Sequence, residues 1–208
     1  MAYYKAALTY TWWRGDPLPP LRQVPKLHCA RSDDVPLLAT LHGVSQANIE
    51  KRLATANNAY LAFLGEQPAG YGWSADRTVG VGDIDWPLGP PDRGLWDFAT
   101  LPAFRGRGIY PHLLQAILRA EEAEAARFWI GHRADNNASE RGIVKAGFQF
   151  VNIAAVTPDF QLRLVPRGDR ERSLADPQGL HFGFVDVADS DMVMLDFDRF
   201  PGPPPGKI

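Results

Sequence analysis

The feature that most constrains this chain of 208 residues is a glycine-rich turn that joins a strand to a helix. Residues 95–101 have the composition of a strand, and Pro102 ends it because proline cannot donate to a strand ladder. Residues 113–118 then place leucine and isoleucine side chains on one face of a helix. The sequence therefore predicts a strand, a tight turn and a helix in immediate succession.

The turn itself, Arg105-Gly106-Arg107-Gly108, has the properties of an anion-binding site. A helix N-terminus exposes unpaired N–H groups and a partial positive charge, and glycines let a phosphate approach the backbone. A pyrophosphate would engage several of these amides together with an arginine. The Walker motif needs Lys and Ser/Thr after its last glycine, and the dinucleotide motif needs a third glycine, so neither matches. The other interpretation open at this point is a tight turn with two solvated arginines.

Clusters of glycine and proline divide the chain. They lie at residues 15–20, 87–94 and 201–206, and we interpret them as a linker, an internal loop and a frayed tail. Up to residue 155 the patterning predicts a strand, a helix, three strands, a helix, a strand, a helix and a strand. Beyond that point the pattern weakens, with strands expected at 161–165 and 180–187 and a charged loop at 167–176.

Composition excludes several classes of protein. Lys and Arg number 22 against 24 Asp and Glu, and a net charge of −2 gives no reason to expect nucleic acid or an anionic membrane as a partner. No stretch is apolar for long enough to span a membrane, and the first 13 residues lack the charged start of an export signal. The one cysteine, Cys29, cannot form an internal disulfide. We therefore expect a soluble protein of the cytoplasm, without a metal site because its histidines show no ligand spacing.

Two motifs resemble those of the GNAT superfamily of N-acyltransferases. The first spans residues 101–109 and is similar to the acyl-CoA-binding pattern R/Q-x-x-G-x-G/A. The second resembles the pattern N-x-x-S/A followed by K-x-G-F, in Asn136-Asn137-Ala138-Ser139 and Lys145-Ala146-Gly147-Phe148. The two motifs lie about thirty residues apart in the matching order of elements, and the resemblance covers roughly residues 27–151, about 60% of the chain.

The resemblance implies an α+β fold, with a mixed, mostly antiparallel sheet that is flanked by helices and splayed between its fourth and fifth strands. We accordingly divide the chain into an N-terminal extension (1–26), a GNAT acetyltransferase core (27–155) and a C-terminal addition with a proline-rich tail (156–208). Acetyl-CoA would lie in the splay, with its pantetheine arm along one strand and its pyrophosphate on the turn. The residues expected to bind it are Phe98, Ala99, Thr100, Arg105, Gly106, Arg107, Gly108, Ile109, Tyr110, Asn136 and Ser139.

Two residues depart from the family pattern. Tyr110 stands where the first motif ends in a small residue, and Ile143 stands where many relatives carry a tyrosine that protonates the leaving thiolate. That role is vacant or has moved, and Tyr110 can take it only if its ring points back along the arm. The base that removes the proton of the amine is expected to be Asp97, beside the thioester, with Asp85 as the second candidate. His132 follows the fifth strand at the mouth of the splay, where it could relay protons.

The function that the resemblance implies is transfer of an acetyl group from acetyl-CoA to a primary amine of a small molecule or peptide, by direct attack in a ternary complex. Holding the two substrates together would supply most of the rate enhancement. Two alternatives remain open: a catalytically weak GNAT-like protein that binds acyl-CoA as a sensor or scaffold, and an unrelated nucleotide-binding domain. The identity of the amine is open, and a homodimer is one possible assembly.

The C-terminal stretch is rich in aspartate. We interpret these residues as an acidic face that draws a cationic acceptor toward the cleft: Asp176, Asp186, Asp189, Asp191, Asp196 and Asp198.

Overall fold

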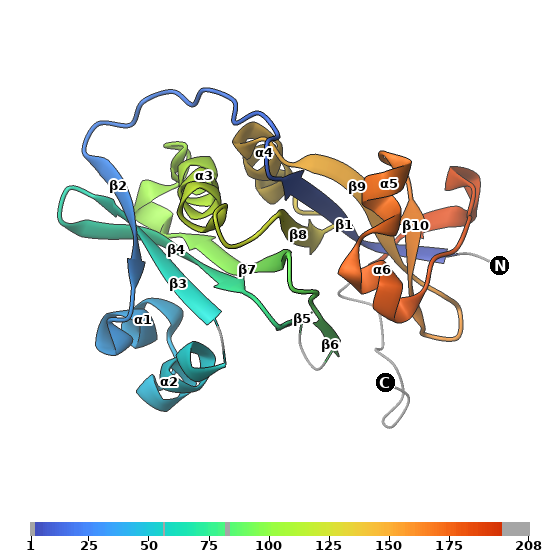
Figure 1. Ribbon diagram of the computed structural model, residues 1–208, viewed down its shortest axis with the longest axis horizontal. Coiled ribbons are helices and arrows are strands. Elements are labelled where there is room, and N and C mark those ends of the chain that lie inside the picture. Colours follow the sequence, from blue (N-terminus) through green and yellow to red (C-terminus); the bar gives the residue numbers. More distant parts are fainter. Residues whose placement is uncertain (1–2, 56, 82–83, 197–208) are drawn as a thin grey trace.

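The computed structural model describes residues 3–55, 57–81 and 84–196, and these contain a main sheet of nine strands with helices on both faces (Figure 1). Eight strands follow one another in the order β10-β9-β1-β8-β7-β4-β3-β2, and β11 lies beside β1. Only the β7–β8 and β1–β11 pairs of this sheet are parallel, so the expected mostly antiparallel sheet is confirmed. The strands are β1 (Tyr3–Trp13), β2 (Leu27–Ser32), β3 (Asn57–Leu64), β4 (Gln67–Ala75), β7 (Asp92–Thr100), β8 (Arg127–Arg133), β9 (Gln149–Val156), β10 (Leu162–Pro166) and β11 (Met192–Met194).

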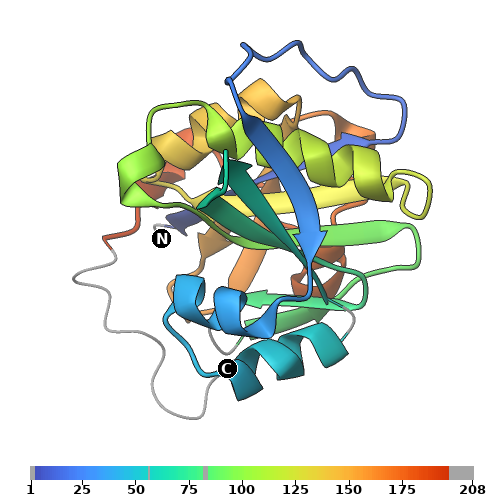
Figure 2. The same ribbon diagram turned by 90° about the vertical axis from the view of Figure 1, so that its left-hand side faces the viewer.

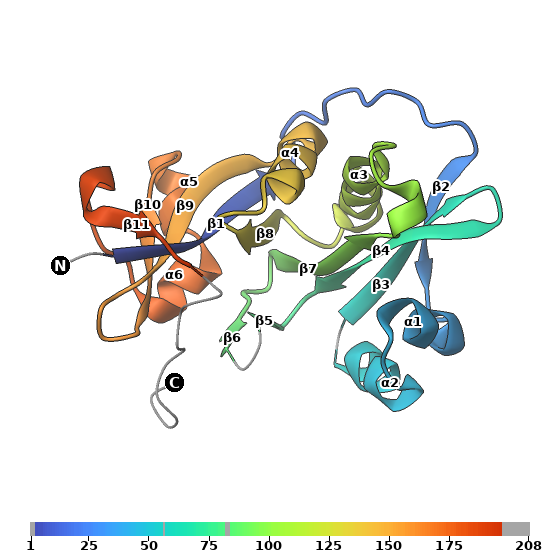
Figure 3. The ribbon, with the colours of Figure 1, turned by 180° about the vertical axis from the view of Figure 1, so that it is seen from behind.

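Two pairs of helices cover opposite faces of the sheet. Helices α3 (Ile109–Glu121) and α4 (Asn137–Ala146) lie on one side, whereas α1 (Val35–His42) and α2 (Gln46–Ala54) lie on the other (Figures 1 and 3). The α+β class is therefore confirmed. Among the described residues, no helix has both the length and the apolar character needed to cross a membrane.

The remaining elements lie around β9, β10 and the loop between β4 and β7. Helix α5 packs on β9 and β10, and α6 packs on β10 and on the separate hairpin of β5 and β6. Their bounds are β5 (Thr78–Val81), β6 (Ile84–Pro87), α5 (Arg170–Leu174) and α6 (Pro177–Phe182), and short 3₁₀ turns span Pro102–Phe104 and Asp189–Asp191.

The first strand corrects the expected order of elements, which began near residue 26. Residues of β1 pair antiparallel with β8 on one edge and with β9 on the other, so the segment lies inside the sheet. Its threonine, tyrosine and tryptophan side chains are typical of strands. The sequence pattern could not predict that β1 lies inside the sheet, because this position depends on pairing with strands more than a hundred residues away.

A long connection follows from this placement. Residues 14–26, which we call the strap, lead from β1 in one half of the sheet to β2 at the far edge of the other half. The strap arches over α3 and α4 on its way (Figures 1 and 2). Its glycine and prolines were interpreted as a linker. The structure places that linker above α3, which follows the first sequence motif, and α4, which lies within the second.

The C-terminal expectations are confirmed only in part. The strand expected at 161–165 is β10, but the expected charged loop at 167–176 contains α5, which Asp169 caps through its side chain. The strand expected at 180–187 is wrong, because Asp176 caps α6 and the proline at the start of that helix suits its first turn. The proline-rich tail at 201–206 lies outside the described residues.

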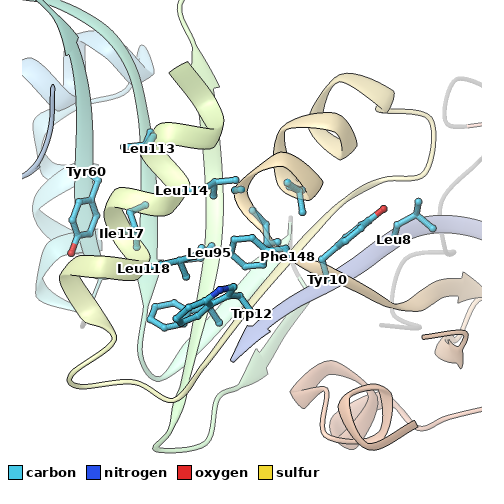
Figure 4. Close-up of a cluster of buried hydrophobic side chains, with 14 of the residues drawn as sticks. Leu8, Tyr10, Trp12, Tyr60, Leu95, Leu113, Leu114, Ile117, Leu118 and Phe148 are labelled. Atoms are coloured by element: carbon cyan, nitrogen blue, oxygen red, sulfur yellow. The ribbon is translucent and has the colours of Figure 1, made fainter. Parts of the chain in front are cut away.

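The main core lies between the sheet and helices α3 and α4. Leucine and isoleucine side chains from the inner face of α3 meet aromatic side chains from β1 and β8, and Phe148, which follows α4, closes the cluster (Figure 4). Tyr10 and Trp12 are each 1% exposed, which accounts for the central position of β1. Burial of this set supplies the hydrophobic stabilisation that holds the two halves of the sheet under one pair of helices.

A buried ion pair links β7 to β8 at the start of both strands. The side chain of Asp92 is 2% exposed, and its two carboxylate oxygens accept from Arg127 Nε at 2.7 Å and Nη2 at 2.9 Å. Trp129 Nε1 donates to the same carboxylate at 2.7 Å. Asp92 and Arg127 are also direct partners in the parallel register. The pair therefore fixes the point at which the two strands are joined.

We expect Arg127→Ala to lower the free energy of unfolding by about 3–5 kcal/mol, because it leaves the buried Asp92 carboxylate without its charged partner. Urea denaturation followed by circular dichroism measures the change. The matched control is Arg77→Ala, which removes an arginine whose side chain is 80% exposed and lies 3.8 Å from Asp76. We expect this control to change the free energy of unfolding by less than about 1 kcal/mol. Equal losses in the two variants would contradict the structural role of Asp92.

Candidate functional site

The candidate site begins where β7 and β8 separate. The two strands pair only from Asp92–Arg127 to Leu95–Ile130. Beyond this point β7 continues beside β4 as far as the Gly70–Thr100 pair, and β8 continues beside β1. Residues 96–100 therefore have one edge of their backbone without a strand partner, and the expected splay between these strands is confirmed.

Asp97 marks the point of divergence. It has φ of +50°, a left-handed conformation that is uncommon for a residue other than glycine, and the pairing of β4 with β7 shifts register between Tyr71 and Trp73. Such a bulge increases the local twist of a strand. It also turns the Asp97 side chain toward α1 and α2, while the next side chain, Phe98, packs on the face covered by α3.

The glycine turn closes the far end of the gap. Gly106 and Gly108 have φ of +76° and +78°, and no described atom lies within 4 Å of a Cβ built on either of them. Gly108 is the N-cap of α3, so no side chain caps the first amides of this helix of 13 residues. The predicted anion-binding arrangement of open backbone at a helix N-terminus is present at this position.

The side chains of this turn contribute less than its backbone. Arg105 Nε donates to the carbonyl of Thr100 at 3.1 Å, and the Arg107 guanidinium lies 5.6 Å from the ring centre of Phe104. Ile109 is 1% exposed and belongs to the core. For Ile109 only the backbone N–H can face a ligand, whereas the exposed Arg107 can reach one with its guanidinium.

Helix α4 forms the opposite wall of the gap. Asn136 caps it by accepting from the N–H of Ser139 through Oδ1 at 3.1 Å, which leaves its Nδ2 free to donate. The Ser139 Oγ lies 3.4 Å from the hydroxyl of Tyr110. The two sequence motifs therefore meet in space, one at the N-terminus of α3 and the other at the N-terminus of α4.

The Tyr110 ring points from α3 toward α4. Its centre is 5.5 Å from that of Phe98, and a Cβ on Gly142 would come within 2.3 Å of its Cδ1. Gly142, the residue before Ile143, therefore provides the space in which the Tyr110 ring lies. Burial raises the pKa of Tyr110 to about 12, against a smaller lowering by its hydrogen bond with Ser139. The phenol thus keeps its proton at neutral pH.

Asp97 lies in a charged and aromatic cluster on the α1 and α2 face. Its Oδ2 accepts from Arg52 Nη1 at 2.6 Å and lies 3.3 Å from His42 Nδ1. Burial of the carboxyl acts to raise its pKa, but the hydrogen bonds from His42 and Arg52 outweigh this and hold the pKa of Asp97 below its ordinary value. No hydrogen bond or ion pair of the described residues uses Oδ1, so this atom is available to a ligand.

Neither Arg52 nor His42 was singled out as functional from the sequence. Trp73 Nε1 donates to His42 Nε2 at 3.1 Å, so the proton of the neutral ring lies on Nδ1, toward Asp97. The Arg52 guanidinium lies over the Trp73 and Trp96 rings at 5.5 and 5.0 Å. An arginine in a stretch where the sequence predicts no helix, and a lone histidine, carry no distinguishing signal, because their contacts with β4 and β7 exist only in the folded chain.

The structure separates the other candidates from this cluster. Asp85 is exposed on β6, in the two-stranded sheet, and no hydrogen bond or ion pair of the described residues links it to Asp97. His132 is a buried residue of β8 rather than of a loop, with Nδ1 2.8 Å from the carbonyl of Arg133 and its ring stacked on Tyr10. The described residues contain no group of three or more His, Cys, Asp or Glu side chains placed to hold a metal ion.

The expected acidic face is wrong for one of its members. Asp176 is 3% exposed, and its carboxylate accepts from Thr9 and Asn152 at 2.9 Å while it caps α6. Asp189 pairs with Arg167. Asp198 lies outside the described residues. Asp176 therefore holds α6 on the sheet and contributes nothing to a charged surface.

Comparisons with known proteins agree with this geometry. The model of the acetyltransferase (GNAT) family matches residues 29–148, more than half of the chain. Among solved structures, the chain is similar to an acetyltransferase from the GNAT family from Colwellia psychrerythraea, with a TM-score of 0.52 and 12% identity over 72% of this chain and 54% of that one. It is also similar to a GCN5-related N-acetyltransferase from Kribbella flavida, with a TM-score of 0.51 and 11% identity over 71% and 55%.

These solved structures support the fold alone, because the identities are low. The chain spans about half the length of these two relatives. A comparison of the sequence with curated proteins gives no match.

The packing of Tyr110 on Gly142 can be tested by a double-mutant cycle. An alanine inside a helix normally stabilises it relative to glycine by about 0.5–1 kcal/mol. Here we expect Gly142→Ala to lower the free energy of unfolding by about 1–3 kcal/mol, because the new methyl group overlaps the Tyr110 ring. In the Tyr110→Ala background the same change should be neutral or stabilising. Urea denaturation of the four proteins gives the coupling, and equal effects of Gly142→Ala in both backgrounds would contradict the contact.

Proposed function

The chain belongs to the acetyltransferase (GNAT) family, and we propose that it is an N-acetyltransferase that moves an acetyl group from acetyl-CoA to a primary amine by direct attack in a ternary complex. The observation that carries the proposal is the gap between β7 and β8, which ends at the uncapped N-terminus of α3. It combines a free strand edge with an anion-binding turn, the two features that an extended thioester with a pyrophosphate needs.

The residues of this gap fit acetyl-CoA. The backbone of Phe98, Ala99 and Thr100 offers N–H and C=O groups to the amides of the pantetheine arm, as an added strand would use them. The turn at Gly106 and Gly108 leaves room for a pyrophosphate on the α3 amides. On the other wall, the free Asn136 Nδ2 can donate to the middle of the arm. When bound, acetyl-CoA supplies the thioester carbonyl that the amine attacks.

Asp97 is proposed to receive the acceptor amine. It lies where the strands diverge, on the sheet face opposite α3, so an amine at its free Oδ1 would approach the gap from the side of α1 and α2. The lowered pKa keeps the carboxylate ionised, which suits it to bind an ammonium group. The proton of the amine would pass to the solvent through a water molecule held at Oδ1. Asp85 is exposed on a separate sheet, which supports Asp97 as the base.

Tyr110 is proposed to protonate the leaving thiolate. Its ring reaches from α3 toward α4 and lies between Gly142 and Phe98, a residue of the strand that would hold the arm. With a pKa of about 12 it carries a proton throughout the neutral range. Its position beside Ile143 supports the view that the role of general acid has moved from α4 to α3.

The alternative is a GNAT-like protein that binds acyl-CoA as a sensor or scaffold. The ion pair of Asp97 with Arg52 favours it, since a carboxylate held by arginine is a weak base. Release of the CoA thiol in the presence of a panel of primary amines separates the two, because a sensor binds acetyl-CoA without turnover on any amine. The cytoplasmic location, the absence of nucleic-acid and membrane partners, the homodimer and the division of the chain into extension, core and addition stay predictions.

Gly108→Glu is expected to weaken CoA binding at least about tenfold, because it places a carboxylate against the pyrophosphate and loses charge-assisted hydrogen bonds. Isothermal titration calorimetry with CoA measures the change. Gly43→Glu is the matched control: Gly43 also has positive φ, of +66°, and open space around a Cβ, but it caps α1 on the other face. An unchanged affinity in Gly108→Glu, or an equal loss in both variants, would overturn the proposed cofactor site.

Asp97→Asn is expected to lower kcat by about 10²–10⁴-fold with an amine that is turned over, while the Kd for CoA stays the same. In the wild type, kcat/KM should rise about tenfold per pH unit from pH 6 to 9. The pKa of Asp97 lies below this pH range and the pKa of Tyr110, about 12, lies above it, so neither group titrates within it. The rate rises with pH because the amine, with a pKa near 10.4, loses its proton as pH increases. Full activity of Asp97→Asn, or a fall in rate below pH 9, would contradict these roles.

A further inference from the structure

A cavity of about 880 Å³ lies between the strap and the outer side of α3 and α4. The strap forms one wall from Pro19 to Pro25, and Val144 and Pro111 of the helices form part of the other. Val144 is 52% exposed and so offers an apolar surface to a ligand in the cavity. The volume is within the range of small-molecule sites.

The strap is fixed in place rather than loosely tethered. At its start, Asp16 accepts from both terminal nitrogens of Arg172, at 2.6 and 2.7 Å. Above α3, Gln115 Nε2 donates to the carbonyl of Pro19 at 2.8 Å. Four prolines between residues 17 and 25 restrict the backbone further. The wall of the cavity is therefore formed before any ligand binds.

The polar lining of the cavity is basic. Arg22 of the strap, Lys145 of the last turn of α4 and Arg107 of the glycine turn all line it. Neither Arg22 nor Lys145 has an ion-pair partner among the described residues, and no acidic residue of that part of the chain lines the cavity. In a chain with a net charge of −2 this is a local excess of positive charge that suits a phosphate.

The same cavity reaches the proposed pyrophosphate site. Gly106 and Gly108 line it together with the strap. A molecule whose pyrophosphate rests on this turn has its pantetheine arm in the gap between β7 and β8, so its other end must leave in another direction. The cavity begins at the turn and combines apolar walls for a base with cations for a phosphate. In CoA, that other end is an adenosine with a 3′-phosphate.

We propose that the strap forms a binding site for the 3′-phosphoadenosine end of CoA, in which Arg22 binds the 3′-phosphate opposite Lys145 and the base lies against Val144. This inference rests on the proposed function. The strap thereby gives the protein a preference for CoA over 3′-dephospho-CoA, which differs only in the phosphate that Arg22 would contact. The strap exists because β1 lies on the far side of the helices from β2.

The test compares CoA with 3′-dephospho-CoA by isothermal titration calorimetry on the full chain. The wild type is expected to bind CoA at least about tenfold more tightly, the difference that one charge-assisted hydrogen bond makes. Arg22→Glu should weaken the binding of CoA at least about tenfold and the binding of 3′-dephospho-CoA less than about twofold. Because Arg22 is exposed on the strap, the variant should fold normally. Arg31→Glu, the same charge change at an exposed position of β2 outside the cavity, should alter neither affinity.

The outcomes separate this inference from the proposed function. If the wild type binds CoA but shows no preference over 3′-dephospho-CoA, or if Arg22→Glu leaves both affinities unchanged or weakens both equally, the strap site is wrong and the proposed function stands. If the wild type binds neither compound, both proposals fail. A preference that Arg22→Glu removes and Arg31→Glu retains supports the site.

Discussion

The arrangement of this protein depends on how briefly β7 and β8 are paired. Four residue pairs join them, and the buried Asp92 carboxylate holds Arg127 and Trp129 at the closed end. The bulge at Asp97 then twists β7 away with β4. Because unpaired backbone groups need partners, the separated edge of β7 can accept an extended ligand in the proposed reaction. A longer pairing would close the gap and leave no place for the arm of CoA.

The two halves of the sheet that this separation creates are held together by elements distant in sequence. Helix α3 and helix α4 bridge them on one face, and β1 enters between β8 and β9 so that aromatic side chains from the N-terminus lie in the centre of the core. Placing β1 there forces the chain to cross the helices to reach β2. The strap is therefore a consequence of the order of strands in the sheet. Its prolines restrict the unfolded chain, so that ordering this long connection costs less conformational entropy.

One of the strained backbone positions of the described residues lies at this gap. Asp97 holds a left-handed backbone conformation that costs of the order of 1–3 kcal/mol, and its hydrogen bonds with Arg52 and His42 help to offset it. On the other side of the sheet, the absence of a side chain at Gly142 admits the Tyr110 ring. The acidic and phenolic groups thus reach the gap from opposite faces, one for each substrate of the proposed reaction.

The sequence by itself determined the parts that depend on local chemistry. The Arg105–Gly108 turn, the amphipathic face of α3 and the Asn136 cap require specific residue types at fixed spacing, so they could be predicted together with the anion site and the family. Tertiary structure alone decided which distant groups meet: β1 inside the sheet, Arg52 and His42 on Asp97, Tyr110 on Gly142, and Arg22 in one cavity with the glycine turn. Each of these contacts joins residues whose proximity arises from strand pairing and helix packing, which no local pattern of side chains encodes.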